Sequence, residues 1–196
     1  MLDKISEIFF LNKEKYLFFK SKSRDLSVCT YPLVMTQSLL SNNSFSQCSY
    51  ENYKKSKQKI FLFRSDKNRL ISAYNKKIKF RDNDLNKLFL LKSTGLANVE
   101  SFADYLRVLS FRKQTNRFID RHFQCYKNGC PHFFNIKIDI DNIDKKLLKK
   151  EIFMEIFSNK IKSSELLSKD RKPISFNNLN DLDKKNLQSY IGLWKI

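Results

Sequence analysis

Apolar and polar positions repeat with two different periods along this chain of 196 residues. Through the middle of the sequence, apolar residues recur every three to four positions, which is typical of amphipathic helices. After a turn at residues 129–132 the period becomes two. Every second residue is then apolar, at Phe134, Ile136, Ile138 and Ile140. This alternation predicts a strand, and the change of period makes residues 69–140 the organising part of the chain.

The N-terminal part is less regular. Apolar residues within 2–20 suit a short amphipathic helix. We prefer a helix that folds back on its own core, and the alternative is an element that binds a partner or a membrane surface. Residues 21–59, rich in Ser, Asn and Lys, indicate a loop-rich connector. The short apolar run at 60–63 follows it. These patterns predict that residues 1–60 form a helix and a loop-rich extension, and that residues 61–196 form the main domain.

Three or four short helices are predicted ahead of the turn. Ser65 or Asp66 can cap the first, which stops near Asn75, and Asp82 or Asp84 can cap the second. Gly95 is placed to end that second helix in a left-handed conformation. A third helix, capped by Asn98, has apolar residues at Phe102, Tyr105, Leu106 and Leu109, and a fourth pattern runs from Phe111 to Phe123.

Two more strands are expected after the turn, because one strand alone leaves its backbone groups unpaired. The run at 148–157 fits a helix or a strand through Ile152, Met154 and Ile156, and we prefer the strand. Pro173–Phe176 supplies the third. The predicted class is therefore α+β, with N-terminal and central short helices followed by a small antiparallel sheet.

The formal charge of +18 suggests either a polyanionic or acidic partner, or a solvated surface enriched in Lys by an AT-rich genome. Nine basic residues are Arg and 29 are Lys, spread along the chain, whereas nucleic-acid readout favours Arg. Aromatic residues between lysines could stack single-stranded bases, but core packing accounts for most of the Phe. Both interpretations of the charge stay open.

The four cysteines, at 29, 48, 125 and 130, form no dense disulfide framework, so we expect reduced thiols. The apolar run at Ile8–Leu11 is too short for a signal peptide, and no stretch approaches the roughly 18 apolar residues of a membrane span. A cytosolic protein is expected.

Sequence signs of catalysis are sparse. Three glycines in the whole chain argue against a phosphate-binding loop, and neither GxSxG nor HExxH occurs. A Cys125–His122 nucleophile pair is conceivable, but no residue orients the base. We expect no catalytic residues, no cofactor and no enzymatic activity.

One cluster of possible metal ligands needs separate consideration. It consists of His122, Cys125, Cys130 and His132. These are the residue types that bind zinc, but their spacing matches no standard zinc module. We therefore prefer packed or surface residues near a turn and predict no metal site.

Five features follow one another in an order shared with a known family. They are Leu70–Lys77, Ser93–Asn98, the helical pattern of 116–123, Cys130–Phe133 before the alternating strand, and Pro173–Phe176 followed by Leu182 and Asp183. In this order, residues 65–185 resemble the TssE-like baseplate wedge family of type VI secretion systems and contractile phage tails. The Glu and Arg of that family's Glu-Pro-Arg-Leu motif are Cys130 and His132 here.

The resemblance implies a structural role. The family member sits in the baseplate wedge and offers β-strands to the first sheath ring, so that the sheath grows by strand addition. Baseplate wedge and sheath proteins would then be the partners. The implied partner-binding residues are Cys130, Pro131, His132, Phe134, Ile136, Ile138, Ile140 and Met154. A basic nucleic-acid-binding protein is the alternative function, ranked second.

Overall fold

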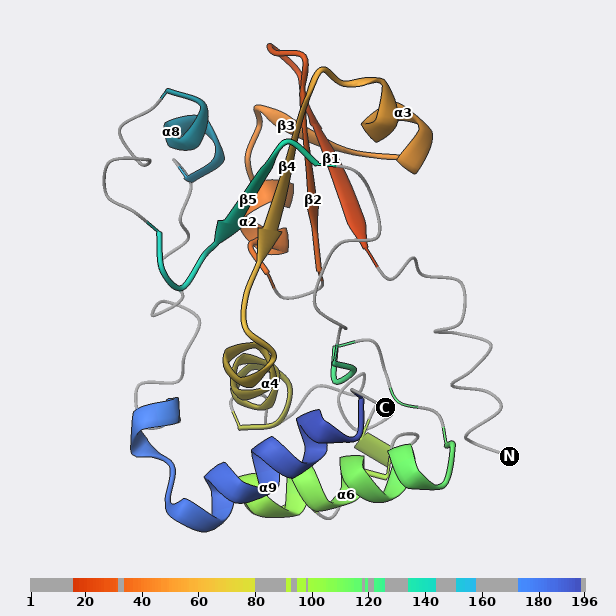
Figure 1. Cartoon of the computed structure of the whole chain (residues 1–196), viewed down its shortest axis with the longest axis vertical. Helices are drawn as coiled ribbons and strands as arrows, with labels where there is room; N and C mark the ends of the chain where they lie inside the picture. Colours follow the sequence, from red (N-terminus) through yellow and green to blue (C-terminus); the bar gives the residue numbers. More distant parts are fainter. Residues whose placement is uncertain are drawn as a thin grey trace. The chain divides into compact units, whose positions relative to one another are not determined.

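The structure is a computed structural model of the whole chain (Figure 1). It describes residues 16–31, 34–79, 91–92, 95–97, 99–117, 119, 122–125, 134–143, 151–157 and 173–194. The chain divides into two units. The helical unit comprises Met1–Lys13, Asp66–Lys127 and Leu166–Ile196, and the sheet unit comprises Glu14–Ser65 and Asn128–Glu165.

The sheet unit contains a mixed sheet with the order β3-β1-β2-β4-β5. Its strands are β1 (Leu17–Ser21), β2 (Leu26–Thr30), β3 (Phe45–Cys48), β4 (Gln58–Phe63) and β5 (Ile136–Asp139). β1 pairs antiparallel with both β2 and β3, whereas β2 with β4 and β4 with β5 are parallel pairs. β1 and β2 are joined by a short turn, so they form a hairpin.

Besides β1, the inner strands of the sheet are β2 and β4, which are buried on both faces. Residues 60–62 of β4 are all apolar, whereas β2 also buries two hydroxyls, that of Ser27 bonded to the Ser56 hydroxyl and that of Thr30 to the Val34 carbonyl. All five residues of β2 are buried, as are Ile60, Phe61 and Leu62 of β4. Strands covered on both faces have near-continuous apolar sequences. These two segments therefore form the centre of the sheet, and each buried large aliphatic side chain contributes about 1.5–3 kcal/mol.

The described residues of this unit also form the helices α2 (Thr36–Leu40), α3 (Tyr50–Lys55) and α8 (Glu151–Phe157). The Ser49 hydroxyl caps α3 by accepting from the Asn52 N–H at 3.3 Å. Phe18 of β1 packs under α3, with ring centroids 5.0 Å from Tyr53. The Glu155 carboxylate of α8 accepts hydrogen bonds from Ser21 and Arg24, which attaches α8 to the end of β1.

The helical unit contains α4 (Asp66–Tyr74), the π-helical turn η1 (Asn75–Lys79), α6 (Phe102–Gln114), the 3₁₀ turn η3 (Phe176–Asn178) and α9 (Asp181–Gly192). Ser101 caps α6 and Asn180 caps α9, each accepting from the backbone N–H three residues on. Tyr105 lies at the centre, 5.3 Å from Tyr74 and 5.6 Å from Phe123 between ring centroids.

Asn75 joins η1 to a distant segment. Its side chain donates to the Ile174 carbonyl at 2.8 Å and accepts from the Ile174 N–H at 3.1 Å. The amide thereby supplies Ile174 with the pair of hydrogen bonds that a neighbouring strand would otherwise give.

Gly95 has the predicted left-handed backbone, with φ of 75°. A Cβ at this position would lie 3.0 Å from the Arg112 guanidinium, whereas a Cβ at Gly192 would meet nothing within 4 Å. Gly95 is thus favoured by its backbone conformation, and a side chain there would also displace the Arg112 guanidinium.

The α+β class is confirmed, and so are the helix that starts at Asp66, the buried face of α6 and the strand at 136–139. The predicted order of helices followed by an antiparallel sheet is wrong. Four of the five strands lie within residues 17–63, before the central helices, and β5 joins them in parallel. The loop-rich connector over 21–59 is therefore also wrong, because it contains β2, β3 and α3.

The two additional strands are not formed. Residues 151–157 form the helix α8, which buries Phe153 and Ile156 and leaves Met154 exposed, as the helical alternative for this run predicts. Pro173–Phe176 leads into the 3₁₀ turn η3. Two smaller predictions also need correction: Ser101 rather than Asn98 caps α6, and α6 continues through Phe111 and ends at Gln114.

Some predictions lie wholly or largely outside the described residues. They are the N-terminal helix up to residue 15, the helix over residues 82–90 and the turn with Cys130, Pro131 and His132. Residues 17–20, the end of the predicted N-terminal helix, are part of β1 instead. The expected domain boundary after residue 60 falls inside β4.

Candidate functional site: the outer strand β5

β5 is an outer strand of the sheet, since within the described part of the chain it pairs with β4 alone. Ile60 is opposite Ile136, and Leu62 is opposite Ile138. The start of the pairing is fixed by Asn135, whose side chain accepts from the Lys59 N–H at 2.8 Å and whose own N–H donates to the Lys59 carbonyl. An outer strand of this kind presents backbone groups for further pairing.

The end of the strand shows which backbone groups those are. Just past β5, the Ile140 N–H donates to the Phe63 carbonyl at 3.0 Å. The Asn135 N–H also faces β4, but Asn135 lies in a bend ahead of β5. Ile140 directly follows Asp139, the register partner of Phe63, and its bond to the Phe63 carbonyl is the one that regular parallel pairing gives. Backbone N–H and C=O groups alternate sides along a strand, so those of Ile136 and Ile138 face β4 like the Ile140 N–H. The backbone groups of Lys137 and Asp139 therefore face away from β4.

The side chains of β5 point to the two faces of the sheet. Ile138 is only 3% exposed and belongs to the buried core, and Ile136 is half-buried on the same side. Lys137 lies on the opposite face, where its ammonium group is 4.5 Å from the centroid of the Phe63 ring. The Asp139 carboxylate accepts from the Asp141 N–H and the Asn142 side chain, and so closes the following turn.

The remaining predicted site residues are not all brought together. Phe134 lies before β5 and packs on Phe61 at 5.6 Å between ring centroids, and Ile140 is half-buried in the turn after β5. Met154 is 52% exposed on α8, a helix that adds no strand to the sheet. Cys130, Pro131 and His132 lie outside the described residues.

The second candidate region, around His122 and Cys125, is a buried polar network of the helical unit. Arg69 is fully buried and donates to the carbonyls of His122, at 2.9 Å, and Gln124, and to the Asp66 carboxylate. The Tyr190 hydroxyl donates to the Phe123 carbonyl at 2.8 Å. The network thus holds residues 122–124 by their backbone carbonyls.

Burial decides the chemistry of Cys125. It raises the pKa of the thiol well above its ordinary value, and the nearby Asp66 carboxylate raises it further, against a smaller lowering by Arg69. A thiol that keeps its proton at neutral pH is a poor nucleophile. The geometry therefore gives the Cys125–His122 pair no activated nucleophile.

Of the four residues in the zinc hypothesis, His122 and Cys125 are described. Among the residues that the structure describes, no three His, Cys, Asp or Glu side chains are grouped to hold a metal ion. Cys130 and His132 are not among those residues, so the four-ligand site stays a hypothesis.

Sequence reasoning missed β4 as the partner of β5. Residues 58–63 combine a short apolar run with polar residues before and after it, which is a recognisable signal of a buried strand. Sequence reasoning also did not recognise that Lys59, Phe61 and Phe63 lie on one face of this strand.

Compared with protein-family models, with curated proteins and with solved structures, the chain gives no significant match. In the described part of the chain, no helix has the length and apolar character needed to cross a membrane.

Proposed function

We propose that this chain is a non-enzymatic assembly protein that accepts a strand from a partner along β5. The observation that carries the proposal is the outward direction of the Lys137 and Asp139 backbone groups at an outer strand. In strand addition these groups supply the affinity, and the alternating side chains set the register of the incoming strand.

As the specific form of this role we propose a baseplate wedge component that joins the baseplate to the sheath of a contractile injection machine in the cytoplasm. It is supported by the order of the sequence features from Leu70 to the strand at 136–139 and by the left-handed turn at Gly95. The closing strand of the family pattern gives no support, because residues 173–176 lead into a 3₁₀ turn. The proposal of strand addition therefore rests on β5.

Lys137→Pro is the most direct test. Proline removes the outward N–H of residue 137 while the hydrogen bonds of Ile136 and Ile138 to β4 remain. Affinity purification of the tagged full chain from its native cell should recover sheath or wedge proteins with the wild type. The variant should recover about tenfold less of these proteins, because an incoming strand would lose the hydrogen bond from the N–H of residue 137 and would clash with the proline ring.

Lys137→Gln is the matched control, since it removes the charge but keeps the N–H, and it should recover the partner normally. Equal recovery with Lys137→Pro, in a protein with unchanged circular dichroism, would exclude strand addition at β5. Partners that are neither sheath nor wedge proteins would exclude the contractile machine alone. A substitution at Ile138 would be a poor test, because its side chain is buried.

A further inference from the structure

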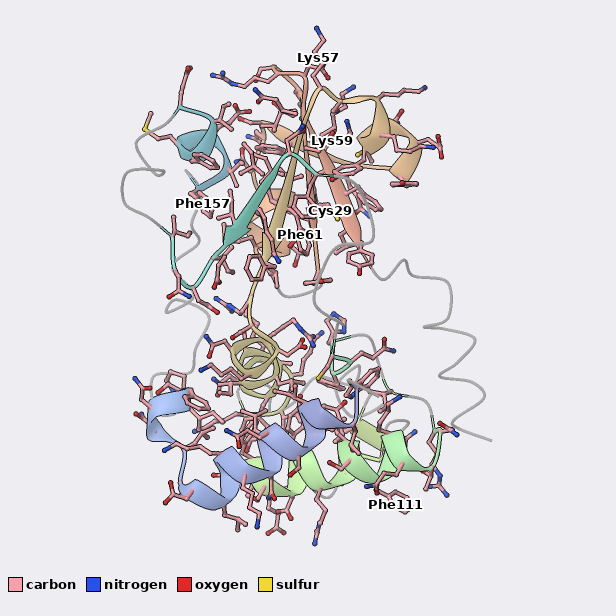
Figure 2. All side chains as sticks on the ribbon, in the orientation of Figure 1. Cys29, Lys57, Lys59, Phe61, Phe111 and Phe157 are labelled. Carbon is pink, nitrogen blue, oxygen red and sulfur yellow. The ribbon has the colours of Figure 1, made fainter. Side chains whose placement is uncertain are left out.

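One face of β4 and β5 combines aromatic rings with lysines. Lys59, Phe61 and Phe63 are two residues apart on β4 and so share a face, and the register places Lys137 of β5 beside Phe61. Figure 2 shows Lys57, Lys59 and Phe61 following one another along β4, with Lys57 at the end of the sheet. We call Lys57, Lys59, Phe63, Phe134 and Lys137 the aromatic–lysine face.

The rings of this face lie on a buried base. Phe61 is 1% exposed and is surrounded by Tyr31, Phe63 and Phe134 at 5.3, 6.0 and 5.6 Å between ring centroids. Phe63 and Phe134 are half-buried, so each ring keeps part of its surface outside this cluster. Rings held in place in this way can stack with a flat partner at little entropic cost.

The charges around these rings are predominantly positive. Lys57 and Lys137 are exposed, Lys59 is half-buried, and Lys54 and Lys55 of α3 precede Lys57 in the sequence. Glu51 pairs with Lys54 at 3.0 Å, so these two charges offset each other. Asp139, the register partner of Phe63, accepts only from neutral groups and keeps its negative charge. Lys55, Lys57 and Lys137 outnumber this carboxylate, so the net charge of the face is positive. This charge is complementary to a chain of phosphates.

We propose that the aromatic–lysine face binds single-stranded nucleic acid. Bases stack on Phe63 and Phe134, and the ammonium groups of Lys57 and Lys137 contact the phosphates between them. Lys137 is exposed and reaches a phosphate by leaving the Phe63 ring. Lys is a point charge without a planar fork, so the face binds with little preference for sequence. The site is distinct from the strand-accepting backbone of β5.

The first test is fluorescence anisotropy with the full chain and labelled 12-nucleotide oligo(U) and oligo(dT). Phe63→Leu combined with Phe134→Leu keeps the apolar cover but removes the stacking surfaces, so affinity should fall roughly tenfold or more. Phe111→Leu is the matched control, because Phe111 is 51% exposed on α6 and has Arg117 over its ring. It should bind like the wild type.

The second test separates local contacts from net charge and does not depend on core side chains. Lys57→Gln with Lys137→Gln should weaken binding and reduce the slope of log affinity against log salt by about 1.4. Lys92→Gln with Lys184→Gln, in the helical unit, removes the same charge and should change the slope less.

Three outcomes would overturn the proposal. They are equal binding of a duplex of the same sequence, equal losses with both lysine pairs, and no loss with either variant of the face. Equal affinity for oligo(U) and oligo(dT) would show that the face recognises only the base rings and the phosphates, and not the sugar. Tighter binding of one of them would identify RNA or DNA as the ligand.

Discussion

At the scale of single residues, burial and not residue type determines what Cys125 can do. Its thiol is 3% exposed and lies among Arg69, Asp66 and Tyr190, and burial raises its pKa. Cys125 was a candidate nucleophile and a candidate metal ligand in the sequence, but its surroundings favour the neutral thiol over the thiolate that either role needs.

This burial predicts a contribution to alkaline instability. In the unfolded chain the Cys125 thiol ionises near pH 8.5, whereas in the folded protein it keeps its proton to higher pH. Above that pH the folded state binds more protons than the unfolded state. The free energy of unfolding should then fall as pH rises, by up to about 1.4 kcal/mol per pH unit from this group.

Urea unfolding of the wild type and Cys125→Ala between pH 8 and 10.5 measures this contribution. The variant should be less stable at pH 8, because it leaves a small cavity, but should lose stability less steeply on going to pH 10.5. Parallel curves would show that the thiol ionises equally in both states.

The buried residues of α6 were predicted correctly, because the helical period alone determines which side chains share a face. Phe102, Tyr105, Leu106 and Leu109 share one helical face and are all buried. Arg69 could not be found in this way, because charged residues are normally exposed and its partners are carbonyls of residues 53 and 55 positions later in the chain.

At the scale of elements, Arg69 connects α4 to the segment at 122–125. Each of α4 and α6 carries an Arg three residues after an Asp, with N–O distances of 3.1 Å in Asp66–Arg69 and in Asp104–Arg107. The Arg69 side chain is 0% exposed and that of Arg107 is 80% exposed. The two pairs share their local geometry and differ in burial.

Arg69→Met should therefore destabilise the protein by about 3–5 kcal/mol, because Asp66 and two carbonyls lose their buried partner. Arg107→Met should change the free energy of unfolding by less than about 1 kcal/mol. Urea denaturation at pH 7 compares the two variants. If both variants lost the same free energy of unfolding, the buried hydrogen bonds of Arg69 would stabilise the protein no more than the exposed ion pair of Arg107 does.

The elements that sequence reasoning found and missed differ in how local their signals are. α4 and α6 have helical periods with caps, and β5 alternates clearly. β1 (LFFKS) and β2 (LSVCT) are short, contain polar residues themselves and stand among further Ser and Lys, so no long apolar or alternating run marks them. The run at 148–157 fits both a helical and a strand period. The structure has the helix, in which Glu155 contacts Ser21 and Arg24, residues far away in the sequence.

At the scale of the whole molecule, both units are built from separated stretches of the chain. No local pattern could reveal this, because the pairing of β4 with β5 joins residues on either side of the stretch Asp66–Lys127, which belongs to the helical unit. The candidate site was predicted only in part: the strand itself was found, but neither its partner nor the direction of its backbone groups.

A fragment of residues 61–196 tests how far β5 depends on the earlier strands. It lacks β1, β2, β3 and half of β4, so β5 loses most of the sheet on which it pairs. We expect residues 136–139 to lose their protection in hydrogen exchange followed by mass spectrometry, relative to the full chain. Full protection of β5 in the fragment would show that a sheet forms without residues 1–60.

The parallel pairing of β4 and β5 also has a consequence during protein synthesis. Lys59 and Asn135, which join the starts of these strands, are 76 residues apart in the chain. At about 5–20 residues per second, a ribosome needs roughly 4–15 s to make β5 after β4. Until then β4 has an open side and an apolar sequence, which attracts other strands. The length of the intervening stretch, most of which is Asp66–Lys127 of the helical unit, thus sets how long this side of β4 stays open to other strands during synthesis.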